Sequence, residues 1–301
     1  MSRRLRTARS DRPPPAADPV RNFEHPAAAL LAARVRPAKS RGQNFLVQGR
    51  VADRIVEAAA LEPADEAIEI GPGLGILSER IAGRVRKFTM VELDRNLAAA
   101  LRRRFEADSR TLVICADFLA LDLAELIERP PAKLVGNLPF NAAAAILHRL
   151  CDFQGLISRM VLMFQREVGA RIRARRGSRE RCALSVFTAL YWDIEDHFRV
   201  LAGSFHPRPK VDSEVIVFRP RESLPFNRSE ERAVLETVRA AFSAPRKAIR
   251  NPLAHRLGLA APAVGAALAA IGIDPTARAA ALEVDDFVRI ARALVERRVK
   301  P

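Results

Sequence analysis

Ala67-Ile68-Glu69-Ile70-Gly71-Pro72-Gly73-Leu74-Gly75 is the stretch that decides how this chain folds. Its first four residues are mostly apolar, which predicts a short buried strand, and three glycines follow at alternate positions. Helical spacing over residues 76–82 predicts a helix after the glycines. A glycine-rich turn between a strand and a helix lets the backbone approach a ligand closely. The stretch therefore predicts a nucleotide-type site, although its GxGxG spacing differs from the GxGxxG of dinucleotide-binding proteins.

The same alternation of strands and helices continues on both sides of this turn. Further strands are predicted at residues 88–94, 111–115, 133–135, 158–164, 193–200 and 214–219, and helices at 51–61, 96–105 and 142–150. This order predicts a Rossmann-like α/β fold, with a mostly parallel, doubly wound sheet that carries helices on both faces. Ligands of such sheets bind at the carboxyl ends of the strands.

The two ends of the chain have a different composition. Beyond residue 225 only helical patterns occur, at 230–242, 247–257, 263–271 and 285–297, which predicts a small all-α domain. Residues 1 to 24 are rich in arginine, proline and alanine, so we expect a flexible arm there and a short helix at 26–36. The expected parts are a flexible basic N-terminal arm (1–38), a sheet-containing domain (39–225) and a helical C-terminal domain (226–301).

Charge points to a polyanionic partner. The 301 residues include 50 Lys and Arg against 35 Asp and Glu, which gives a net charge of +15. Such an excess is typical of proteins that bind nucleic acid, while a merely basic soluble protein is the alternative. The widely spaced Cys115, Cys151 and Cys182 are expected to be small buried hydrophobes in a reducing compartment. We expect no metal site, no membrane span, no secretion and a cytoplasmic protein.

Two acidic residues at strand ends sharpen the ligand prediction. Glu92 ends the second strand, where a carboxylate can accept hydrogen bonds from both hydroxyls of a ribose. Asp117 and Phe118 follow the third strand, where a carboxylate can take an adenine amine and a ring can cover its face. Each acid alone would be read as a capping or solvated residue. Together with Gly71 and Gly73 they predict an adenosine site that fits either NAD or S-adenosylmethionine.

Asn137-Leu138-Pro139-Phe140, at the end of the fourth strand, favours S-adenosylmethionine and methylation of an exocyclic amine. The lone pair of an adenine amine is delocalised into the ring, so the amine is a poor nucleophile. The Asn137 amide oxygen and the Pro139 carbonyl can accept its two protons, and Phe140 can stack on the base. No strong general base is required, because rate comes from positioning and electrostatic fit. The alternative is a plain Asn-x-Pro turn.

Together these motifs resemble the small-subunit ribosomal RNA adenine dimethyltransferase family (KsgA/RsmA), relatives of the Erm-type methylases. The matching stretches are Gly42-Gln43-Asn44-Phe45-Leu46, 69–75, 91–94, 116–118, 137–141, 165–168, 184–186, 204–213 and Ala241-Phe242-Ser243 with Arg246-Lys247. The resemblance implies a class I methyltransferase domain over 39–225 and monomeric action. It implies S-adenosylmethionine contacts at Asn44, Leu46, Gly71, Glu92, Asp117 and Asn137. It also implies base handling by Asn137, Leu138, Pro139 and Phe140, with Phe205 as a second aromatic near the base.

The chain departs from the family pattern at three places. Phe140 replaces the usual tyrosine, which keeps the stacking face and loses a hydroxyl contact. Arg181-Cys182-Ala183 stands where a Tyr-Gly pair is common, and this puts local RNA contacts in doubt. The arm before residue 40 is longer than is typical of the family.

Two arginine-rich segments predict where RNA binds. The first is expected to be a loop beside the sheet, and the second lies in the helical domain. Basic residues over such a span can neutralise the phosphates of folded RNA, and a solvated basic surface is the alternative. The first segment holds Arg171, Arg173, Arg175, Arg176, Arg179 and Arg181, and the second holds Arg246, Lys247, Arg250 and Arg256. The site residues expected to contact RNA are Arg171, Arg173, Arg175, Arg176, Arg179, Arg246, Lys247 and Arg250.

The preferred function is dimethylation of two adjacent adenines near the 3′ end of small-subunit rRNA, on an assembling subunit. One alternative is an Erm-type enzyme that methylates large-subunit rRNA and confers macrolide resistance. A second is a non-catalytic RNA-binding assembly factor, against which the intact Glu92, Asp117 and Asn137 argue. A nicotinamide-dependent dehydrogenase is disfavoured by the glycine spacing.

Overall fold

A seven-stranded sheet forms the centre of the molecule in the computed structural model, which describes residues 26–32, 43–139 and 141–299. The strand order is β4-β3-β2-β5-β6-β9-β7, parallel from β4 to β6, with β9 antiparallel to both β6 and β7. The Rossmann-like prediction is confirmed. The strands are β2 (Glu66–Ile70), β3 (Lys87–Glu92), β4 (Thr111–Cys115), β5 (Ala132–Asn137), β6 (Ile157–Gln165), β7 (Trp192–Val200) and β9 (Ser213–Pro220).

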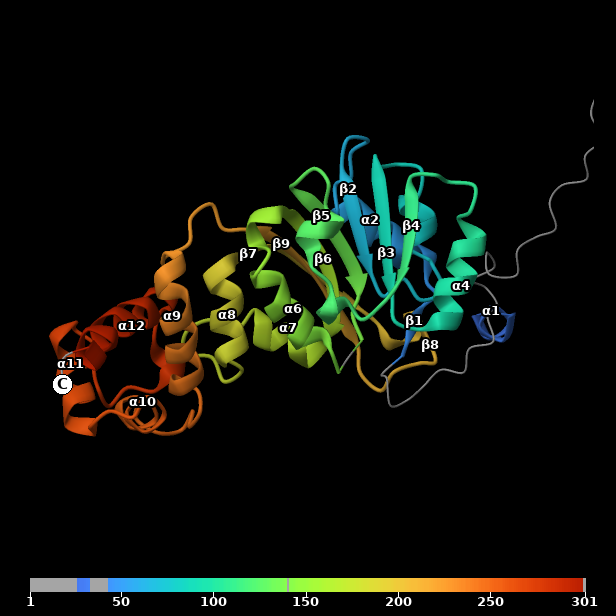
Figure 1. The fold of residues 1–301 in the computed structure, drawn as a ribbon. Coiled ribbons are helices and arrows are strands. Elements are labelled where there is room, and N and C mark those ends of the chain that lie inside the picture. The colour runs from blue at the N-terminus through green and yellow to red at the C-terminus, as the bar shows by residue number, and fades with distance from the viewer. Residues whose placement is uncertain (1–25, 33–42, 140, 300–301) are drawn as a thin grey trace, which may run out of the picture.

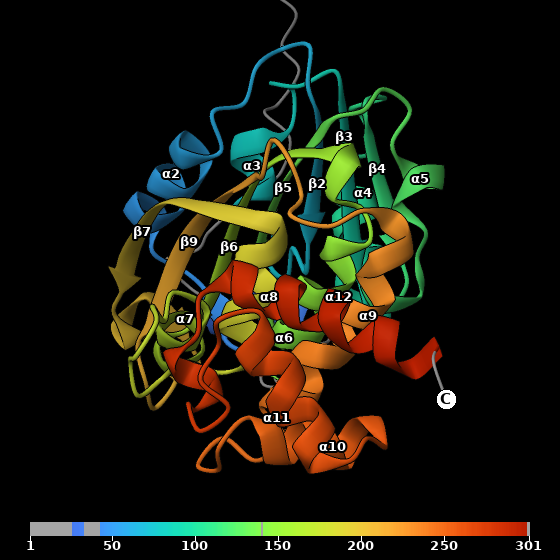
Figure 2. The same ribbon diagram turned by 90° about the vertical axis from the view of Figure 1, so that its left-hand side faces the viewer.

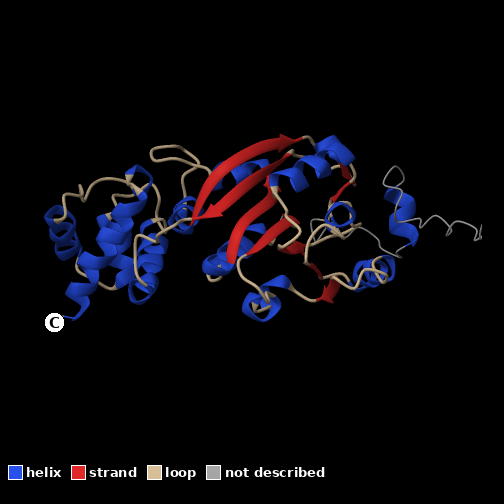
Figure 3. Cartoon of the chain, turned by 90° about the horizontal axis from the view of Figure 1, so that it is seen from above, coloured by secondary structure: helices blue, strands red, loops and turns tan. Residues whose placement is uncertain are grey.

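Helices cover both faces of this sheet, as Figure 3 shows from above. One face packs on α2 (Gly49–Ala58), α3 (Ser78–Ile81) and α4 (Arg95–Arg104); the other packs on α5 (Leu123–Leu126), α6 (Ala143–Cys151), α7 (Arg166–Ile172) and α8 (Ala183–Tyr191). Strand residues alternate between the two cores. On β6, Met160 and Leu162 join the core beneath α6 and α8, whereas Val161 and Met163 join the core beneath α2. Burial of both faces explains the nearly continuous apolar runs of these strands.

The chain after the sheet is helical, with α9 (Arg228–Ala241), α10 (Arg250–Leu257), α11 (Ala261–Ala270) and α12 (Val284–Val299). Figures 1 and 2 show these helices gathered beside α8, at the end of the molecule away from α1. A capping box starts α9, because Asn227 Oδ1 accepts from Glu230 N at 3.0 Å and Glu230 Oε2 accepts from Asn227 N at 2.9 Å. Leu190 of α8, Val234 and Phe287 share one core, so the helical segment is packed onto the sheet-bearing part.

Two short elements lie at the other end of the molecule. In α1 (Pro26–Ala32), Leu30 packs with Phe45, Leu74 and Leu97. β1 (Phe45–Leu46) pairs antiparallel with β8 (Phe205–His206). Residues 1–25 and 33–42, which hold most of the predicted arm and the end of the predicted helix, lie outside the described residues. Among the described residues, no helix is long and apolar enough to cross a membrane.

Candidate active site

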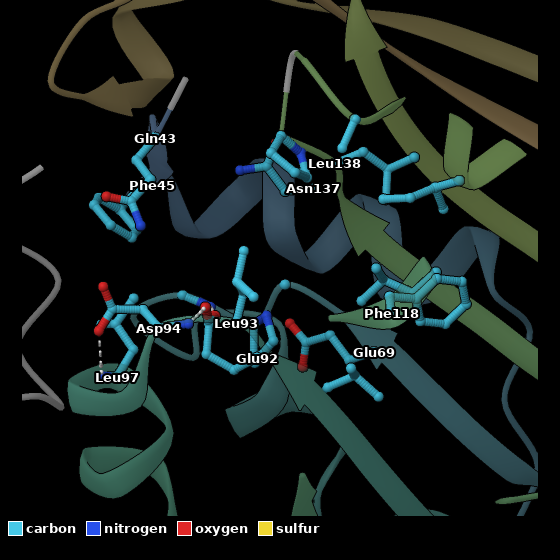
Figure 4. A pocket seen from close by; sticks show the side chains of 18 of the residues that line it. Gln43, Phe45, Glu69, Glu92, Leu93, Asp94, Leu97, Phe118, Asn137 and Leu138 are labelled. Atoms are coloured by element: carbon cyan, nitrogen blue, oxygen red, sulfur yellow. Dashed lines mark hydrogen bonds between the residues drawn. The ribbon is translucent and has the colours of Figure 1, made fainter. Parts of the chain in front are cut away.

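A cavity of about 300 Å³ lies at the carboxyl ends of β2, β3, β4 and β5, the edge where the parallel strands predict a ligand (Figure 4). Most of the residues predicted to form the site line this cavity. They are Asn44, Leu46, Gly71, Gly73, Glu92, Asp117, Phe118, Asn137, Leu138 and Pro139. Elements far apart in sequence therefore converge here, and the volume suits a small organic cofactor.

The glycine turn closes one side of the cavity, and two of its glycines, Gly71 and Gly73, line it. Gly71 and Gly73 have φ of +66° and +58°, a region that residues with a Cβ rarely adopt. A Cβ on Gly73 would also lie 2.9 Å from the Phe45 ring. Beneath the turn, the buried Arg104 guanidinium donates to the Leu74 carbonyl at 3.1 Å and pairs with Glu79. The turn is therefore held from behind by the end of α4.

Two buried carboxyl groups face the cavity beside this turn (Figure 4). Glu92 is 6% exposed and accepts from the backbone N–H groups of Gly73 at 3.0 Å and Asp94 at 2.9 Å. Burial raises the pKa of Glu92 above its ordinary value, although these hydrogen bonds oppose the rise. Glu92 thus holds the glycine turn and still presents oxygens to a ligand.

Glu69 is the second carboxyl group, and sequence reasoning did not place it in the site. It is 1% exposed, and burial raises its pKa to about 8, with the Ser78 hydroxyl donating to Oε2 at 2.6 Å and Glu92 adding repulsion. The signal that could have revealed it is an acid inside the apolar run 67–70, because an acid buried at the end of a strand is a candidate for a functional role. A cationic ligand group would favour its ionised form.

The far end of the cavity is formed by the turn after β4. Asp117 is exposed, and its Oδ1 accepts from Leu119 N at 3.0 Å, which caps a 3₁₀ turn at Phe118–Ala120. Phe118 is 6% exposed and belongs to the core beneath α6, with part of its surface on the cavity. Leu93, 59% exposed, lines the cavity from the turn after β3. A flat ring between Leu93 and Phe118 would have apolar contact on both sides, with a carboxylate at its edge.

Asn137 lies across the cavity from Glu92, at the end of β5 (Figure 4). Its Nδ2 donates to the main-chain oxygen of Asn44 at 3.0 Å. A carbonyl can only accept, so the atom that faces Asn44 is the amide nitrogen, and Oδ1 is the atom left to accept a proton from a ligand. Gly136 makes this placement possible, because a Cβ there would lie 2.9 Å from the Ile70 carbonyl.

The Pro139 carbonyl does not match its predicted use. It accepts from the backbone N–H groups of Ala142 and Ala143, both at 3.0 Å, and so begins α6 instead of facing a ligand. Among the described residues none donates to the Leu138 carbonyl, which precedes it. Phe140, predicted to stack on the base, lies outside the described residues.

Phe205 is not brought to the cavity. It is 4% exposed in β8, opposite Leu46 of β1, and packs in the core beneath α2. It does not line the cavity, whereas its neighbour across the ladder, Leu46, does. Strand pairing turns this ring into the core, away from the cavity, and its predicted place near the base stays a prediction.

The first arginine-rich segment is more structural than its sequence suggests. Arg171 lies in the last turn of α7 instead of in a loop, and Arg173 pairs with the buried Glu214 at 2.7 Å. Arg176 pairs with Glu283 at 3.0 Å. Arg175 and Arg179 are exposed and have no recorded ion pair among the described residues.

Arg181, which the sequence grouped with these arginines, is 8% exposed. Its guanidinium donates to the carbonyls of Ala174 at 3.2 Å and Leu282 at 3.0 Å, and burial lowers its pKa. It ties the segment to the helical part of the chain and is not available to RNA. In the second cluster Arg246, Lys247 and Arg250 are all exposed around the start of α10.

Comparison with known proteins gives consistent findings over most of the chain. Residues 36–296 match the family model described as ribosomal RNA adenine dimethylase. Ribosomal RNA small subunit methyltransferase A of Syntrophotalea carbinolica is 39% identical over 259 residues, which cover 86% of this chain and 97% of that protein. A dimethyladenosine transferase from Plasmodium falciparum shares the fold, with a TM-score of 0.70, 21% identity, and 82% and 95% of the two chains covered. The 23S rRNA methyltransferase ErmE gives a TM-score of 0.63, 27% identity, and 84% and 100% coverage.

Proposed function

We propose a function from one premise, that the chain belongs to the ribosomal RNA adenine dimethylase family. It is a methyltransferase that uses S-adenosylmethionine and acts on ribosomal RNA. The reaction is N6-dimethylation of two adjacent adenines near the 3′ end of small-subunit rRNA. The small-subunit target is favoured over the Erm-type alternative because curated relatives named small subunit methyltransferase A reach 38–39% identity, whereas ErmE reaches 27%.

The cavity fits this cofactor, which supplies an electrophilic methyl group on a sulfonium. We propose that Glu92 accepts from the ribose hydroxyls and that Asp117 accepts from the adenine amine, with Phe118 against the ring. The open backbone at Gly71 and Gly73 lies beside the buried carboxyl groups, where a positively charged ligand gains most from them. Asn44 and Leu46, which line the same cavity, are proposed as further contacts.

Two oxygens at the end of β5 are proposed to hold the target amine. Oδ1 of Asn137 is oriented as an acceptor by the bond from Nδ2 to Asn44. The second acceptor is the carbonyl of Leu138 in place of Pro139, because Pro139 already serves two backbone amides. Two acceptors favour a tetrahedral nitrogen as it attacks, and the amine sheds its proton once alkylated. The adenine must leave its stack to reach this point, and Phe140 remains the predicted stacking partner.

RNA is proposed to bind across the arginine-bearing surfaces. Arg171, Arg175 and Arg179 beside the sheet are exposed, as are Arg246, Lys247 and Arg250 on the helical segment. Arg173 and Arg176 keep a supporting role through their ion pairs. Exposed arginines and lysines that neutralise phosphates make affinity steeply dependent on salt.

We further propose bounds for the two domains and a place of action for the protein. The methyltransferase domain spans 39–225 and the helical domain 226–301, preceded by the basic arm. The protein acts as a monomer on the assembling small subunit, and therefore in the cytoplasm, where its substrate is made. One activity then accounts for both the excess of positive charge and the cavity.

Transfer of labelled methyl groups to undermethylated small subunits tests the proposal, with Asn137→Ala as the inactive variant. Asn251→Ala, the same change on an exposed asparagine of α10, is the matched control. Label in dimethyladenosine of small-subunit rRNA, lost only in Asn137→Ala, supports the proposal. Label confined to large subunits would favour the Erm-type reading. Binding of RNA without label in either subunit would favour a non-catalytic assembly factor.

A further inference from the structure

Glu214 is a buried carboxylate that the cavity does not use. It is 5% exposed on β9, opposite Phe164 of β6 and Arg199 of β7. Residues two apart on a strand share a face, and Ile216 and Phe218 of β9 join the core on the side of α6, α7 and α8. Glu214 therefore points beneath α7, the helix that leads into the first arginine-rich segment.

The two oxygens of Glu214 have unlike surroundings. Oε1 lies 2.7 Å from Arg173 Nη2 and 3.2 Å from His197 Nδ1. Oε2 is buried and has no hydrogen-bond partner among the described residues. A buried carboxylate is costly without a partner, so the Arg173 guanidinium at the end of α7 is what stabilises its charge.

Gly169 in α7 explains how the helix approaches this carboxylate. A Cβ at position 169 would lie 2.2 Å from Glu214 Oε2, 3.1 Å from Cδ and 3.2 Å from Cβ. The carboxyl group is enclosed and has little room to move aside. Glycine in a helix interior is unfavourable relative to alanine, so its presence here indicates that helix and carboxylate are fitted to each other.

The segment that follows α7 is held on its other side by the helical part of the chain. Gly177 N donates to the Ala280 carbonyl at 2.8 Å, and the pairs of Arg176 with Glu283 and of Arg181 with Leu282 lie beside it. The only ion pair from this segment to the sheet, within the described residues, is that of Arg173 with Glu214. The segment is thus held on both sides. Glu214 holds it to the sheet, and the helical part of the chain holds it on the other side.

We propose that Glu214 is a positioning residue for RNA binding, which acts through Arg173 and the close fit to Gly169. It sets α7 against the sheet and thereby fixes where Arg171, Arg175 and Arg179 stand relative to the strand ends that form the cavity. Glu214 does not line the cavity, so it acts on the RNA side of the reaction and not on the cofactor side. The inference rests on the proposed function, since it takes RNA as the ligand of these arginines.

A double-mutant cycle tests this role with Glu214→Ala, Gly169→Ala and the combined variant. Each single change is expected to raise KM for undermethylated small subunits about tenfold, with kcat and the affinity for S-adenosylmethionine within about twofold of the unchanged protein. The combined variant is expected to match Glu214→Ala, because both changes act at one contact: once the carboxylate is gone the new methyl group meets only the Cβ of residue 214, at 3.2 Å, which a shift of a few tenths of an ångström relieves. Glu214→Gln, which keeps an acceptor for Arg173, is expected to be intermediate.

Glu195→Ala is the matched control, because Glu195 is a carboxylate on the neighbouring strand that pairs with Arg159 and Arg219 away from α7. Thermal unfolding shows whether each variant is folded. If Glu214→Ala is not folded, the KM values of Gly169→Ala and Glu214→Gln test the inference. An unchanged KM in these variants, or effects of Glu214→Ala and Gly169→Ala that simply add, would overturn the inference. If the unchanged protein methylates no RNA, the proposed function fails first.

Discussion

The acids of the cavity and the arginines beyond α7 are both charged groups that the sequence singled out, yet the structure holds them in opposite ways. Glu92 and Asp117 bond to backbone groups 19 residues away or nearer. The partners of Arg176 and Arg181 in the helical segment lie 107 and 101 residues away. A short motif carries its own supporting contacts, whereas an arginine's role depends on what the rest of the chain brings beside it.

The largest effect is expected at the end of β5, where Asn137→Ala should lower kcat by about a thousandfold, or about 4 kcal/mol. The change removes the acceptor proposed for the target amine and the bond to Asn44. Cofactor affinity, measured by calorimetry, should change only a few-fold, because the glycine turn and Glu92 remain. An unchanged rate of methyl transfer in single-turnover assays would show that Asn137 is not required for the reaction.

Removal of Arg181 should show that an arginine predicted for RNA is part of the structure. Arg181→Ala leaves the Ala174 and Leu282 carbonyls without their donor, so we expect a loss of about 2 to 3 kcal/mol in the free energy of unfolding. Denaturant unfolding measures it, with the exposed Arg179→Ala as the neighbouring control. If the two variants were equally stable, Arg181 would contribute no more to stability than the exposed Arg179, and its structural role would be contradicted.

The free energy of unfolding should depend on pH through the buried carboxyl group of Glu69. The pKa of Glu69 rises from 4.5 to about 8 on folding, so the folded chain binds more protons than the unfolded chain between these values. Stability conferred by the protonated form is therefore lost as pH rises through this window, by about 2 kcal/mol between pH 6.5 and pH 8 alone. Glu69→Gln removes this dependence, and urea unfolding without cofactor at pH 5, 6.5 and 8 should show the two profiles diverging. Parallel profiles would contradict the assignment.

Charge reversal at the exposed arginines should give the smallest effect. Arg175→Glu with Arg179→Glu is expected to weaken RNA binding about tenfold at moderate salt and to make the salt dependence shallower. These positions are cleaner than Arg173 and Arg176, whose reversal would also break pairs with Glu214 and Glu283. Binding isotherms over a salt series provide the measurement. An unaltered slope would place the RNA elsewhere.

The sequence predicted most of the sheet because its strands are apolar runs of distinct length. The predicted 111–115 agrees with β4, and the other predicted strands of the sheet agree with the observed ones within two residues at every end. Helix α8 was missed because it is apolar on nearly all sides, between the sheet and α9, and so has no helical stripe of polar residues. Helix α7 was missed because it contains a glycine and several charged residues, which do not form a helical pattern. The reason for Gly169 is its contact with Glu214, which is distant in sequence.

Some residues of the site could likewise be placed from the sequence, and others could not. Gly71, Glu92 and Asn137 could be placed because each follows a strand whose direction is predictable. Phe205 could not, since its side chain is turned inward by a two-residue ladder with β1 that no local pattern indicates. The use of the Pro139 carbonyl to start α6 likewise depends on backbone geometry and not on residue type.

The packing of Leu30 of α1 against Phe45, Leu74 and Leu97 has a practical consequence for handling the protein. All three of these partners also line the cavity, so α1 backs its outer wall. Affinity tags and fluorescent labels belong at the end of α12, which lies at the opposite extremity of the molecule in Figure 1. A bulky fusion joined just before Pro26 would press on the wall that any enzymatic assay depends upon.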